Sequence, residues 1–233
     1  MPRKKLPSVT LICVAGVQSF RAILAILKSS FRVNFKNVTL ISPKLPTVKL
    51  GKFSIEKPFG SQLDSMDEYN RYIIYSLHRH INSDFALIIQ ADGYVLSGKK
   101  WLDSFLDYDF IGAPWPKSDS AYIDPFGRQH QVGNGGFSLR SKKLLEVPLN
   151  FEVEWNVNQN DFYKHFGAGY QSEDGIIAVH NRHIYERAGC NFADFDIASK
   201  FSRELPIPGF VFGKTFGFHK YKPKSRLRLM FKK

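Results

Sequence analysis

Two short stretches with carboxylates are the parts of this sequence best suited to chemistry. In the first, the apolar run 85–89 leads into Gln90, Ala91, Asp92 and Gly93. Such a run predicts a strand buried on both faces, as in a mainly parallel sheet. Open α/β sheets bind ligands beyond the carboxyl ends of their strands, so Asp92 would stand at such an end. Gly93 would let the chain turn away from the ligand, although an ordinary Asp-Gly turn accounts for the same residues.

The second stretch is the adjacent pair Glu173 and Asp174, which precedes the apolar run 176–179. Acidic residues are favoured in the first turn of a helix by the helix dipole, which gives the pair a purely structural interpretation. The functional interpretation is that one carboxylate is a general base at the floor of a cleft. A base of this kind must lie within hydrogen-bond reach of the proton it removes.

A glycine-rich stretch lies between these two. Gly133, Asn134, Gly135 and Gly136 lead into Phe137. Glycine lets the backbone approach a ligand closely or adopt positive φ. The stretch is not a P-loop, because no Gly-Lys-Ser/Thr follows. A glycine bulge before a strand remains the structural alternative.

Apolar periodicity predicts the elements that position these residues. Continuous apolar runs predict strands at 9–15, 38–41 and 85–90. A helix is predicted between the first two strands, with its apolar face at spacing i, i+3, i+4, i+7. This face consists of Phe20, Ile23, Leu24 and Leu27. A second helix over 65–81 is predicted to open on a capping box of Ser65 and Glu68.

The second half of the chain is predicted to hold shorter elements. We expect short helices at 99–106 and 141–147 and a strand at 109–115. Residues 43–63 would form a loop over the cleft, either without regular structure or with a short edge strand. The order β-α-β-loop-α-β allows parallel strands joined by helical crossovers. The predicted class is therefore α/β, with a mixed, mainly parallel central sheet flanked by helices in a single Rossmann-like domain.

The charge of the chain is concentrated at its ends. The net charge of the 233 residues is +12; three basic residues lie at 3–5, and eight Lys or Arg with no acid lie from Lys214 onward. We therefore predict a basic tail at 1–7, a domain at 8–221 and a basic tail at 222–233. The last segment mixes basic and apolar residues, so it would lie on an anionic membrane surface or form a solvated tail.

Composition excludes several classes of protein. Cys13 and Cys190 form neither a disulfide framework nor a metal-binding spacing, which favours a reducing compartment. The apolar run near the start is too short to span a membrane. Despite a pI of about 9.6, no nucleic-acid recognition motif is present. We expect a cytoplasmic protein, soluble or peripheral on the membrane, with no specific nucleic-acid partner.

Four stretches occur in an order typical of one enzyme class: Gln90–Gly93, Gly133–Leu139, Ser172–Gly175 and Gly217–His219. This order resembles the glycosyltransferases of the GT-A fold. More specifically, it is similar to a bacterial family of surface-polysaccharide glycosyltransferases long classed as a domain of unknown function. The resemblance covers about residues 8–221. It implies a GT-A-like domain that transfers a hexosyl or related sugar from a nucleotide-sugar donor to a hydroxyl of a glycan or lipid-linked acceptor, as in lipopolysaccharide or other surface-polysaccharide synthesis.

The resemblance also implies a divalent metal, Mn²⁺ or Mg²⁺, bound by an Asp-x-Asp motif and a later ligand. Hard cations of this kind favour oxygen ligands. Here Gln90 replaces the first acid, which leaves Asp92 and His219 as the metal ligands and puts tight metal binding in doubt. Lys214 or Lys220 would then share the phosphate charge.

Site roles follow from the same resemblance. Asp174 would be the base of an inverting transfer, and Glu173 would bind the acceptor or orient Asp174. Trp115 would stack on an acceptor sugar, although a lone Trp is more often part of a core. The donor would contact residues from three stretches: Gln90, Asp92, Gly93, Asn134, Gly135, Gly136 and Lys214.

Two other functions fit parts of the sequence. A non-catalytic nucleotide- or sugar-binding module could share the fold, although such a module needs no paired base. A nucleic-acid binder could use the basic tails. A binding module would differ from the transferase by lacking turnover. A nucleic-acid binder would lose all function when residues 222–233 are removed.

Overall fold

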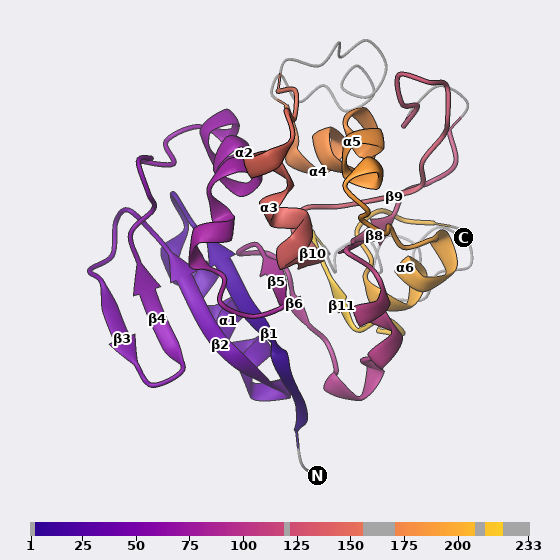
Figure 1. Ribbon diagram of the computed structural model, residues 1–233. Helices are drawn as coiled ribbons and strands as arrows, with labels where there is room; N and C mark the ends of the chain where they lie inside the picture. Colours follow the sequence, from indigo (N-terminus) through magenta and orange to yellow (C-terminus); the bar gives the residue numbers. More distant parts are fainter. Residues whose placement is uncertain (1–2, 119–121, 156–170, 208–212, 221–233) are drawn as a thin grey trace, which may run out of the picture.

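A mixed β-sheet organises the computed structural model, which describes residues 3–118, 122–155, 171–207 and 213–220 (Figure 1). Seven strands of the described chain form it in the order β3-β4-β2-β1-β5-β10-β7. β4, β2, β1 and β5 run parallel, whereas β10 is antiparallel to both β5 and β7. The strands are β1 (Lys4–Val14), β2 (Val33–Ile41), β3 (Val48–Leu50), β4 (Phe53–Glu56), β5 (Phe85–Ile89), β7 (Phe110–Ile111) and β10 (Phe137–Ser141).

Two short ribbons and several helices complete the described structure. The ribbons pair β6 (Tyr94–Val95) with β11 (Gly217–Phe218), and β8 (Ala113–Pro114) with β9 (Val132–Gly133). The α-helices are α1 (Ser19–Arg32), α2 (Met66–Tyr75), α3 (Lys142–Asn150), α4 (Glu173–Gly175), α5 (Arg182–Arg187) and α6 (Phe195–Phe201). Within the described ranges, no helix combines the length and apolar character that crossing a bilayer requires.

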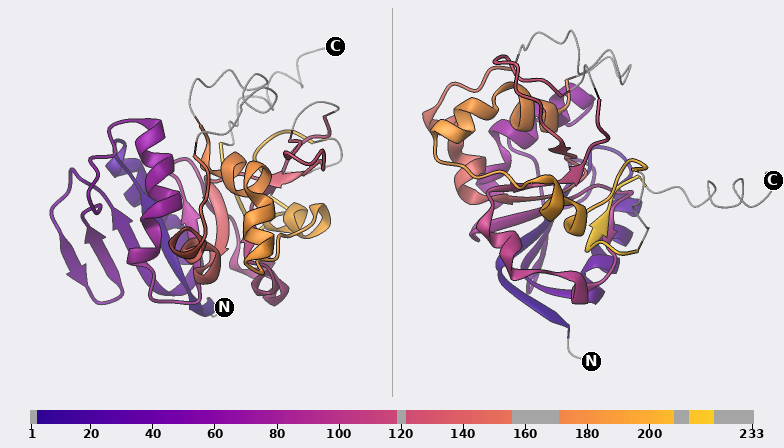
Figure 2. Two further views of the ribbon diagram at one scale, coloured as in Figure 1. Left: turned by 45° about the horizontal axis from the view of Figure 1, so that its top comes forward. Right: turned by 90° about the vertical axis from the view of Figure 1, so that its right-hand side faces the viewer.

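Both faces of the central sheet are covered, which explains the continuous apolar runs of its strands. Along β1, Leu11 and Cys13 pack in the same cluster as α1, whereas Ile12 and Val14 pack with residues of α2. Figures 1 and 2 show α1 on one side of the sheet and α2 and α3 on the other. The prediction of an α/β architecture with a mixed, mainly parallel sheet flanked by helices is confirmed.

The predicted second helix is present, but its capping box is only half formed. Ser65 accepts a hydrogen bond from the backbone N–H of Glu68 at 3.1 Å. The Glu68 carboxylate turns back instead to the backbone N–H groups of Gln62 and Asp64, at 3.1 and 2.7 Å. Glu68 therefore orders the loop that leads into α2. The α-helix ends at Tyr75, and a 3₁₀ turn at Leu77–His80 completes the predicted segment.

The prediction of which face of α1 contacts the core was wrong. Phe20 and Leu27 are 73% and 57% exposed, whereas the buried residues of α1 are Ala22, Ala25, Ile26 and Ser29. Small side chains on this face let the helix approach the sheet closely. The Ser29 hydroxyl also accepts a hydrogen bond from the backbone N–H of Val95 at 3.1 Å, which joins α1 to β6.

Other differences concern short elements. β1 begins at Lys4, so residues 4–7 of the predicted basic tail belong to a strand that pairs with β2. The predicted loop at 43–63 contains the short edge strand that was one of the alternatives, β3, and also a second strand, β4. The predicted helix at 99–106 consists of 3₁₀ turns, and α6, capped by the side chain of Asp194, was not predicted. The predicted tail at 222–233 lies outside the described residues.

The orientation of α1 is tested by two neighbouring substitutions. We expect Ile26→Ala to lower the free energy of unfolding by about 2–5 kcal/mol, because it leaves a cavity under the helix. Leu27→Ala should change the free energy by less than about 0.5 kcal/mol, because Leu27 faces solvent. Urea denaturation measures both. Equal losses, or a larger loss for Leu27→Ala, would contradict the orientation.

Candidate functional site

The four stretches singled out in the sequence meet beyond the carboxyl end of β5. The backbone N–H of Gln90 donates to the carbonyl of Gly136 at 2.9 Å. The backbone N–H of Asn134 donates to Asp174 Oδ2 at 2.9 Å. His219 Nε2 lies 3.1 Å from Asp92 Oδ1. Residues far apart in sequence therefore form one contiguous group of polar side chains.

Strand register explains how this meeting arises. β10 runs antiparallel to β5, and Phe137 pairs with Ile89. The residues just before β10, including Asn134 and Gly136, therefore lie beside those just after β5. The pairing of β11 with β6, Phe218 against Tyr94, places His219 next to the same turn.

Asn134 is the common partner of three of the stretches. Its φ is +69°, a left-handed conformation that Asn tolerates better than most residues. Its side-chain Oδ1 accepts a hydrogen bond from the backbone N–H of Gly136 at 3.0 Å and lies 2.9 Å from His219 Nδ1. Together with its backbone bond to Asp174, Asn134 connects the glycine-rich stretch, the acidic pair and the late histidine.

The glycines of this stretch are required by packing within the protein. A Cβ on Gly135 would lie 1.6 Å from Glu173 Oε1, and one on Gly136 would lie 2.2 Å from the His219 ring. Both values are far below any real contact distance. The space that a Cβ would occupy at these two glycines is filled by Glu173 and His219, which gives the glycines a structural reason. Similarly, a Cβ on Gly93 would lie 2.7 Å from the carbonyl oxygen of Phe218.

Asp174 is half-buried and held by three donors. Oδ1 accepts from the Ser172 hydroxyl at 2.5 Å and from the Gly175 N–H at 2.9 Å, and Oδ2 accepts from the Asn134 N–H. A carboxylate offers about four lone-pair positions, so about one remains for a further hydrogen bond. These hydrogen bonds fix the carboxylate. They leave it able to accept one further hydrogen bond, for example from a hydroxyl group, or to take up a proton.

Glu173, in contrast, faces the interior. It is 4% exposed, and its Oε1 accepts a hydrogen bond from Arg140 Nη2 at 2.8 Å. Burial raises the pKa of Glu173, and the Arg140 guanidinium opposes this rise. The Glu173 side chain is enclosed by Gly135 and Arg140, so Asp174 is the more exposed acid of the pair.

Arg140 is the main residue of the site that was not predicted from the sequence. It is fully buried in β10, where it also donates from Nε to the Ser138 hydroxyl at 3.2 Å. Its guanidinium carbon lies 5.3 Å from the centre of the Phe110 ring. An arginine inside a short predicted strand is a signal in itself, because a buried cation requires a carboxylate partner.

His219 lies between two carboxylates. Nε2 is near Asp92 at ion-pair distance, although without good hydrogen-bond direction, and Nδ1 lies 3.1 Å from Glu204 Oε1. Burial opposes the charged imidazole, but Asp92 and Glu204 outweigh it and raise the pKa of His219. His219 in turn lowers the pKa of Asp92. In Glu204, burial is outweighed by His219 and Lys220, so its pKa is lowered as well.

The donor set at this position does not fit a divalent metal as arranged. Among the residues that the structure describes, no group of three or more His, Cys, Asp or Glu side chains could hold an ion. Both ring nitrogens of His219 face oxygen atoms, which favours the protonated ring, and a protonated nitrogen cannot bind a metal. The amide nitrogen of Gln90 donates to the Tyr69 hydroxyl at 3.0 Å. Of the two predicted metal ligands, Asp92 and His219, Asp92 is the exposed one, with 55% of its side chain accessible.

The remaining two predicted site residues are Trp115, which packs against Gly133 of the glycine-rich stretch, and Lys214. Trp115 is 2% exposed; its ring stacks on Tyr122 at 4.4 Å, and a Cβ on Gly133 would overlap it. Its faces are therefore covered by protein in this structure. Lys214 follows Gly213, whose carbonyl accepts a hydrogen bond from Lys100. Lys214 therefore precedes β11, whereas His219 directly follows this strand.

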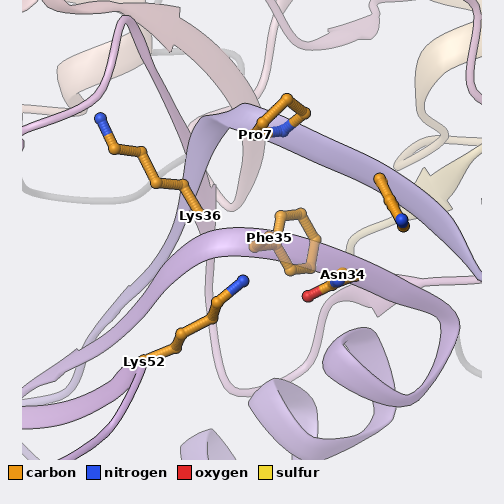
Figure 3. Close-up of a pocket in the computed structure, with 6 residues that line it drawn as sticks. Pro7, Asn34, Phe35, Lys36 and Lys52 are labelled. Carbon is orange, nitrogen blue, oxygen red and sulfur yellow. The ribbon is translucent and has the colours of Figure 1, made fainter.

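Figure 3 shows a pocket of about 400 Å³ elsewhere on the sheet. It lies at the amino end of β1, where Lys5 pairs with Asn34, and thus at the opposite end of the strands from Asp92. Its lining consists of Lys5, Pro7, Asn34, Phe35, Lys36 and Lys52. Lys36 points away from Phe35 and donates to the carbonyl of Asn82 at 2.8 Å. None of the predicted site residues lines this pocket.

The buried ion pair makes a direct prediction about stability. Arg140→Met should lower the free energy of unfolding by about 3–5 kcal/mol, because Glu173 is left buried without a counter-charge. Glu173→Met should cost a similar amount for the reciprocal reason. The double variant should be more stable than the sum of the two losses implies. Additive losses in a double-mutant cycle would contradict direct coupling of the two residues.

The His219 cluster predicts a pH dependence of stability. A histidine whose pKa is raised in the folded protein stabilises the fold fully below pH 6.5, its usual pKa. This stabilisation is lost as the pH rises through the folded-state pKa. Lowered carboxylate pKa values contribute stability above their usual 3.8 and 4.5 and lose it as pH falls through the folded-state values. The cluster therefore stabilises most between pH 4.5 and 6.5.

We expect His219→Gln to destabilise the protein more at about pH 5.5 than at about pH 9. At the lower pH, the substitution removes charged hydrogen bonds that contribute about 1.5–3 kcal/mol each. Chemical denaturation of both proteins at the two pH values measures the difference. A loss that is the same at both, or greater at high pH, would show that His219 is neutral in the folded protein.

Comparison with known proteins gives structural neighbours and one family. The neighbours include the galactosyltransferase LgtC in complex with donor and acceptor sugar analogues, which is 13% identical with a TM-score of 0.47 over 92% of this chain and 87% of that chain. An active-site mutant of LgtC is 11% identical with a TM-score of 0.48, over 92% and 88%. The glycosyltransferase GlyE of Streptococcus pneumoniae TIGR4 is 14% identical with a TM-score of 0.43, over 95% and 56%.

Similarity at this level establishes neither a shared activity nor shared substrates. None of the curated proteins matches the chain. A family model described as "Protein of unknown function (DUF5672)" matches residues 52–219, which span all four stretches of the site. The predicted resemblance to a domain-of-unknown-function family is thereby confirmed, and the chain belongs to the DUF5672 family.

Proposed function

We propose that this protein is a glycosyltransferase of the GT-A type, which moves a sugar from a nucleotide-sugar to an acceptor hydroxyl. The observation that carries the proposal is the meeting of Asp92, Asn134, Asp174 and His219 beyond the carboxyl end of β5. This is the position at which α/β sheets bind their ligands. The resemblance of the four stretches to surface-polysaccharide glycosyltransferases gives the reaction class.

The donor would lie against the turn after β5 and the glycine-rich stretch. The proposed contacts are Gln90, Asp92, Gly93 and the loop 134–136, and the one carboxylate among them, Asp92, is exposed. Departure of a nucleoside diphosphate develops negative charge on a phosphate oxygen. A protonated His219 beside this turn would offset part of this charge, because fixed charges near a developing anion lower the barrier.

Asp174 is the proposed base. The acceptor hydroxyl oxygen would attack the anomeric carbon, the bond from this carbon to the diphosphate oxygen would break, and the hydroxyl proton would pass to Asp174. The sugar carbon is attacked from the face opposite the leaving group, so its configuration inverts. The donors from Ser172, Gly175 and Asn134 would hold the carboxylate for this transfer.

Glu173 has a different proposed role from the one the sequence suggested. Its ion pair with Arg140 joins the start of α4 to β10, and Asp174 is the next residue. Glu173 therefore acts as a positioning residue for the base. The acceptor is proposed to be a glycan or a lipid-linked sugar at the cytoplasmic face of a membrane, as surface-polysaccharide synthesis requires.

A specific observation also favours a second candidate, a nucleotide- or sugar-binding module without turnover. The acidic pair argued for catalysis because a pure binder has no need of it. The burial of Glu173 against Arg140 gives one of these acids a structural reason. Only Asp174 then distinguishes a transferase from a binder.

The test therefore compares Asp174→Asn with a matched Asp194→Asn control. Asp194 caps α6, and Asn caps helices as well as Asp does. We expect Asp174→Asn to reduce sugar transfer by about 10²–10⁴-fold, as loss of a general base does, while donor affinity stays close to that of the wild type. Transfer is measured as nucleoside diphosphate release from a panel of nucleotide-sugars with glycan acceptors, and affinity by calorimetry.

Near-wild-type turnover of Asp174→Asn would remove Asp174 as the base. Donor binding without turnover by the wild-type protein would favour the binding module. Loss of both transfer and donor binding in Asp194→Asn would show that the assay reports on folding instead of chemistry.

A further inference from the structure

Helix α1 carries a line of large apolar side chains on its outer surface. Four of them occur at spacings of four, three and four residues, so they fall along one side of the helix. These are Phe20, Leu24, Leu27 and Phe31, and Val17, two residues before the helix begins, is exposed as well. Their exposed fractions range from 39% for Leu24 to 78% for Phe31. We refer to these five residues as the α1 stripe.

The stripe has no role in the core. The opposite side of α1, with Ala22, Ala25, Ile26 and Ser29, already packs on the sheet. Figures 1 and 2 show that α1 lies on the face of the sheet away from α2 and α3. A contiguous line of exposed Phe and Leu side chains is rare on soluble proteins and marks an interaction surface.

Positive charge flanks the stripe. α1 contains Arg21, Lys28 and Arg32 and no acidic residue. Lys28 and Arg32 lie over the Tyr94 ring, at 4.6 and 5.6 Å from its centre. Arg3 donates to the Ser30 carbonyl at 2.9 Å, which brings a further cation to the end of the helix.

The same asymmetry extends through the first part of the chain. The first acidic residue of the sequence is Glu56. Ten basic residues precede it: Arg3, Lys4, Lys5, Arg21, Lys28, Arg32, Lys36, Lys44, Lys49 and Lys52. Seven of these ten lie between residues 6 and 55, so this part of the chain has a local excess of positive charge in addition to the charge at the two ends.

We propose that α1 docks this protein on an anionic membrane surface. The stripe would enter the boundary between headgroups and acyl chains, and the flanking Arg21, Lys28 and Arg32 would contact lipid phosphates. An exposed apolar face bordered by Lys and Arg is how interfacial helices bind bilayers. The proposal is independent of the glycosyltransferase function and differs from membrane binding by the C-terminal tail.

A second copy of the chain fits the same surface less well. Stable protein interfaces bury about 1,200–2,000 Å² in total, and a helix of this length is only about 21 Å long. Symmetric pairing of two α1 helices would also bring Arg21, Lys28 and Arg32 of both copies together, with no acid on the helix to pair with them. An anionic bilayer offers acyl chains to the α1 stripe and negatively charged headgroups to Arg21, Lys28 and Arg32.

Vesicle flotation tests the proposal with the full-length protein. The probes are vesicles of phosphatidylcholine alone and of phosphatidylcholine mixed with phosphatidylglycerol. We expect the wild-type protein to float with the anionic vesicles, and Phe20→Ser/Phe31→Ser to bind them at least about tenfold more weakly. Arg21→Glu/Lys28→Glu should also weaken binding and reduce its sensitivity to salt.

Two controls separate the contribution of α1 from that of other surfaces. Phe126→Ser removes an equally exposed aromatic side chain outside α1 and should bind as the wild type does. Met230→Ser/Phe231→Ser alters the C-terminal tail, and the loss caused by the α1 variant should appear with this tail intact. Thermal melting of each variant checks that the fold is retained.

Several results would overturn the proposal. The first is that the wild-type protein does not float with anionic vesicles. The second is that Phe20→Ser/Phe31→Ser binds as well as the wild type does, while only the tail variant loses binding. A wild-type dimer that dissociates on Phe20→Ser/Phe31→Ser, without vesicle binding, would assign the α1 stripe to a second copy of the chain.

Discussion

The buried ion pair between Arg140 and Glu173 is the interaction on which the candidate site depends. Arg140 lies in β10, between β5 and the edge strand β7, and Glu173 begins α4. An unpaired charge at either position would carry a large desolvation penalty, so the two elements are held together. Because Asp174 follows Glu173 directly, the pair also sets the distance between Asp174 and the glycine-rich stretch. The fold thus uses a structural interaction to place a residue that remains available for chemistry.

Asn134 and the adjacent glycines complete this arrangement. Asn134 adopts a left-handed conformation and contacts both Asp174 and His219. Gly135 and Gly136 let Glu173 and His219 approach the backbone at distances that any side chain would prevent. The glycine-rich stretch is therefore a junction between the acidic pair and the histidine. Its glycines would be required for this reason alone, whether or not a donor sugar also passes over them.

Much of the fold could be predicted from the sequence because its central strands are buried on both faces. Continuous apolar runs located β1, β2 and β5, and a Ser at the right position located the start of α2. The face of α1 could not be predicted in this way, since large apolar residues such as Phe20 point outward while Ala25 and Ile26 point inward. Periodicity identifies an apolar side, but only packing shows which of two apolar sides meets the sheet.

The sequence could predict which residues make up the candidate site, but not which residues they contact. Asp92, Asn134, Asp174 and His219 were recognisable from motifs that recur in order. The partners Arg140 and Glu204 were missed, because an ion pair between residues 33 and 15 positions apart leaves no local pattern. Trp115 and Lys214 were selected for residue types that suit a sugar site. In the structure Trp115 is buried against Gly133 and Tyr122, and Lys214 follows Gly213, whose carbonyl accepts from Lys100.

Binding of a nucleotide-sugar by the group around Asp92 underlies the whole proposed function, and calorimetric titration measures it. Wild-type protein and Asp92→Ala would each be titrated with UDP-, GDP-, CMP- and dTDP-sugars, with and without Mn²⁺. We expect saturable binding of one nucleotide class by the wild type and clearly weaker binding of the same class by Asp92→Ala. Absence of binding to every donor, or equal affinity in the two proteins, would show that this group is not a donor site.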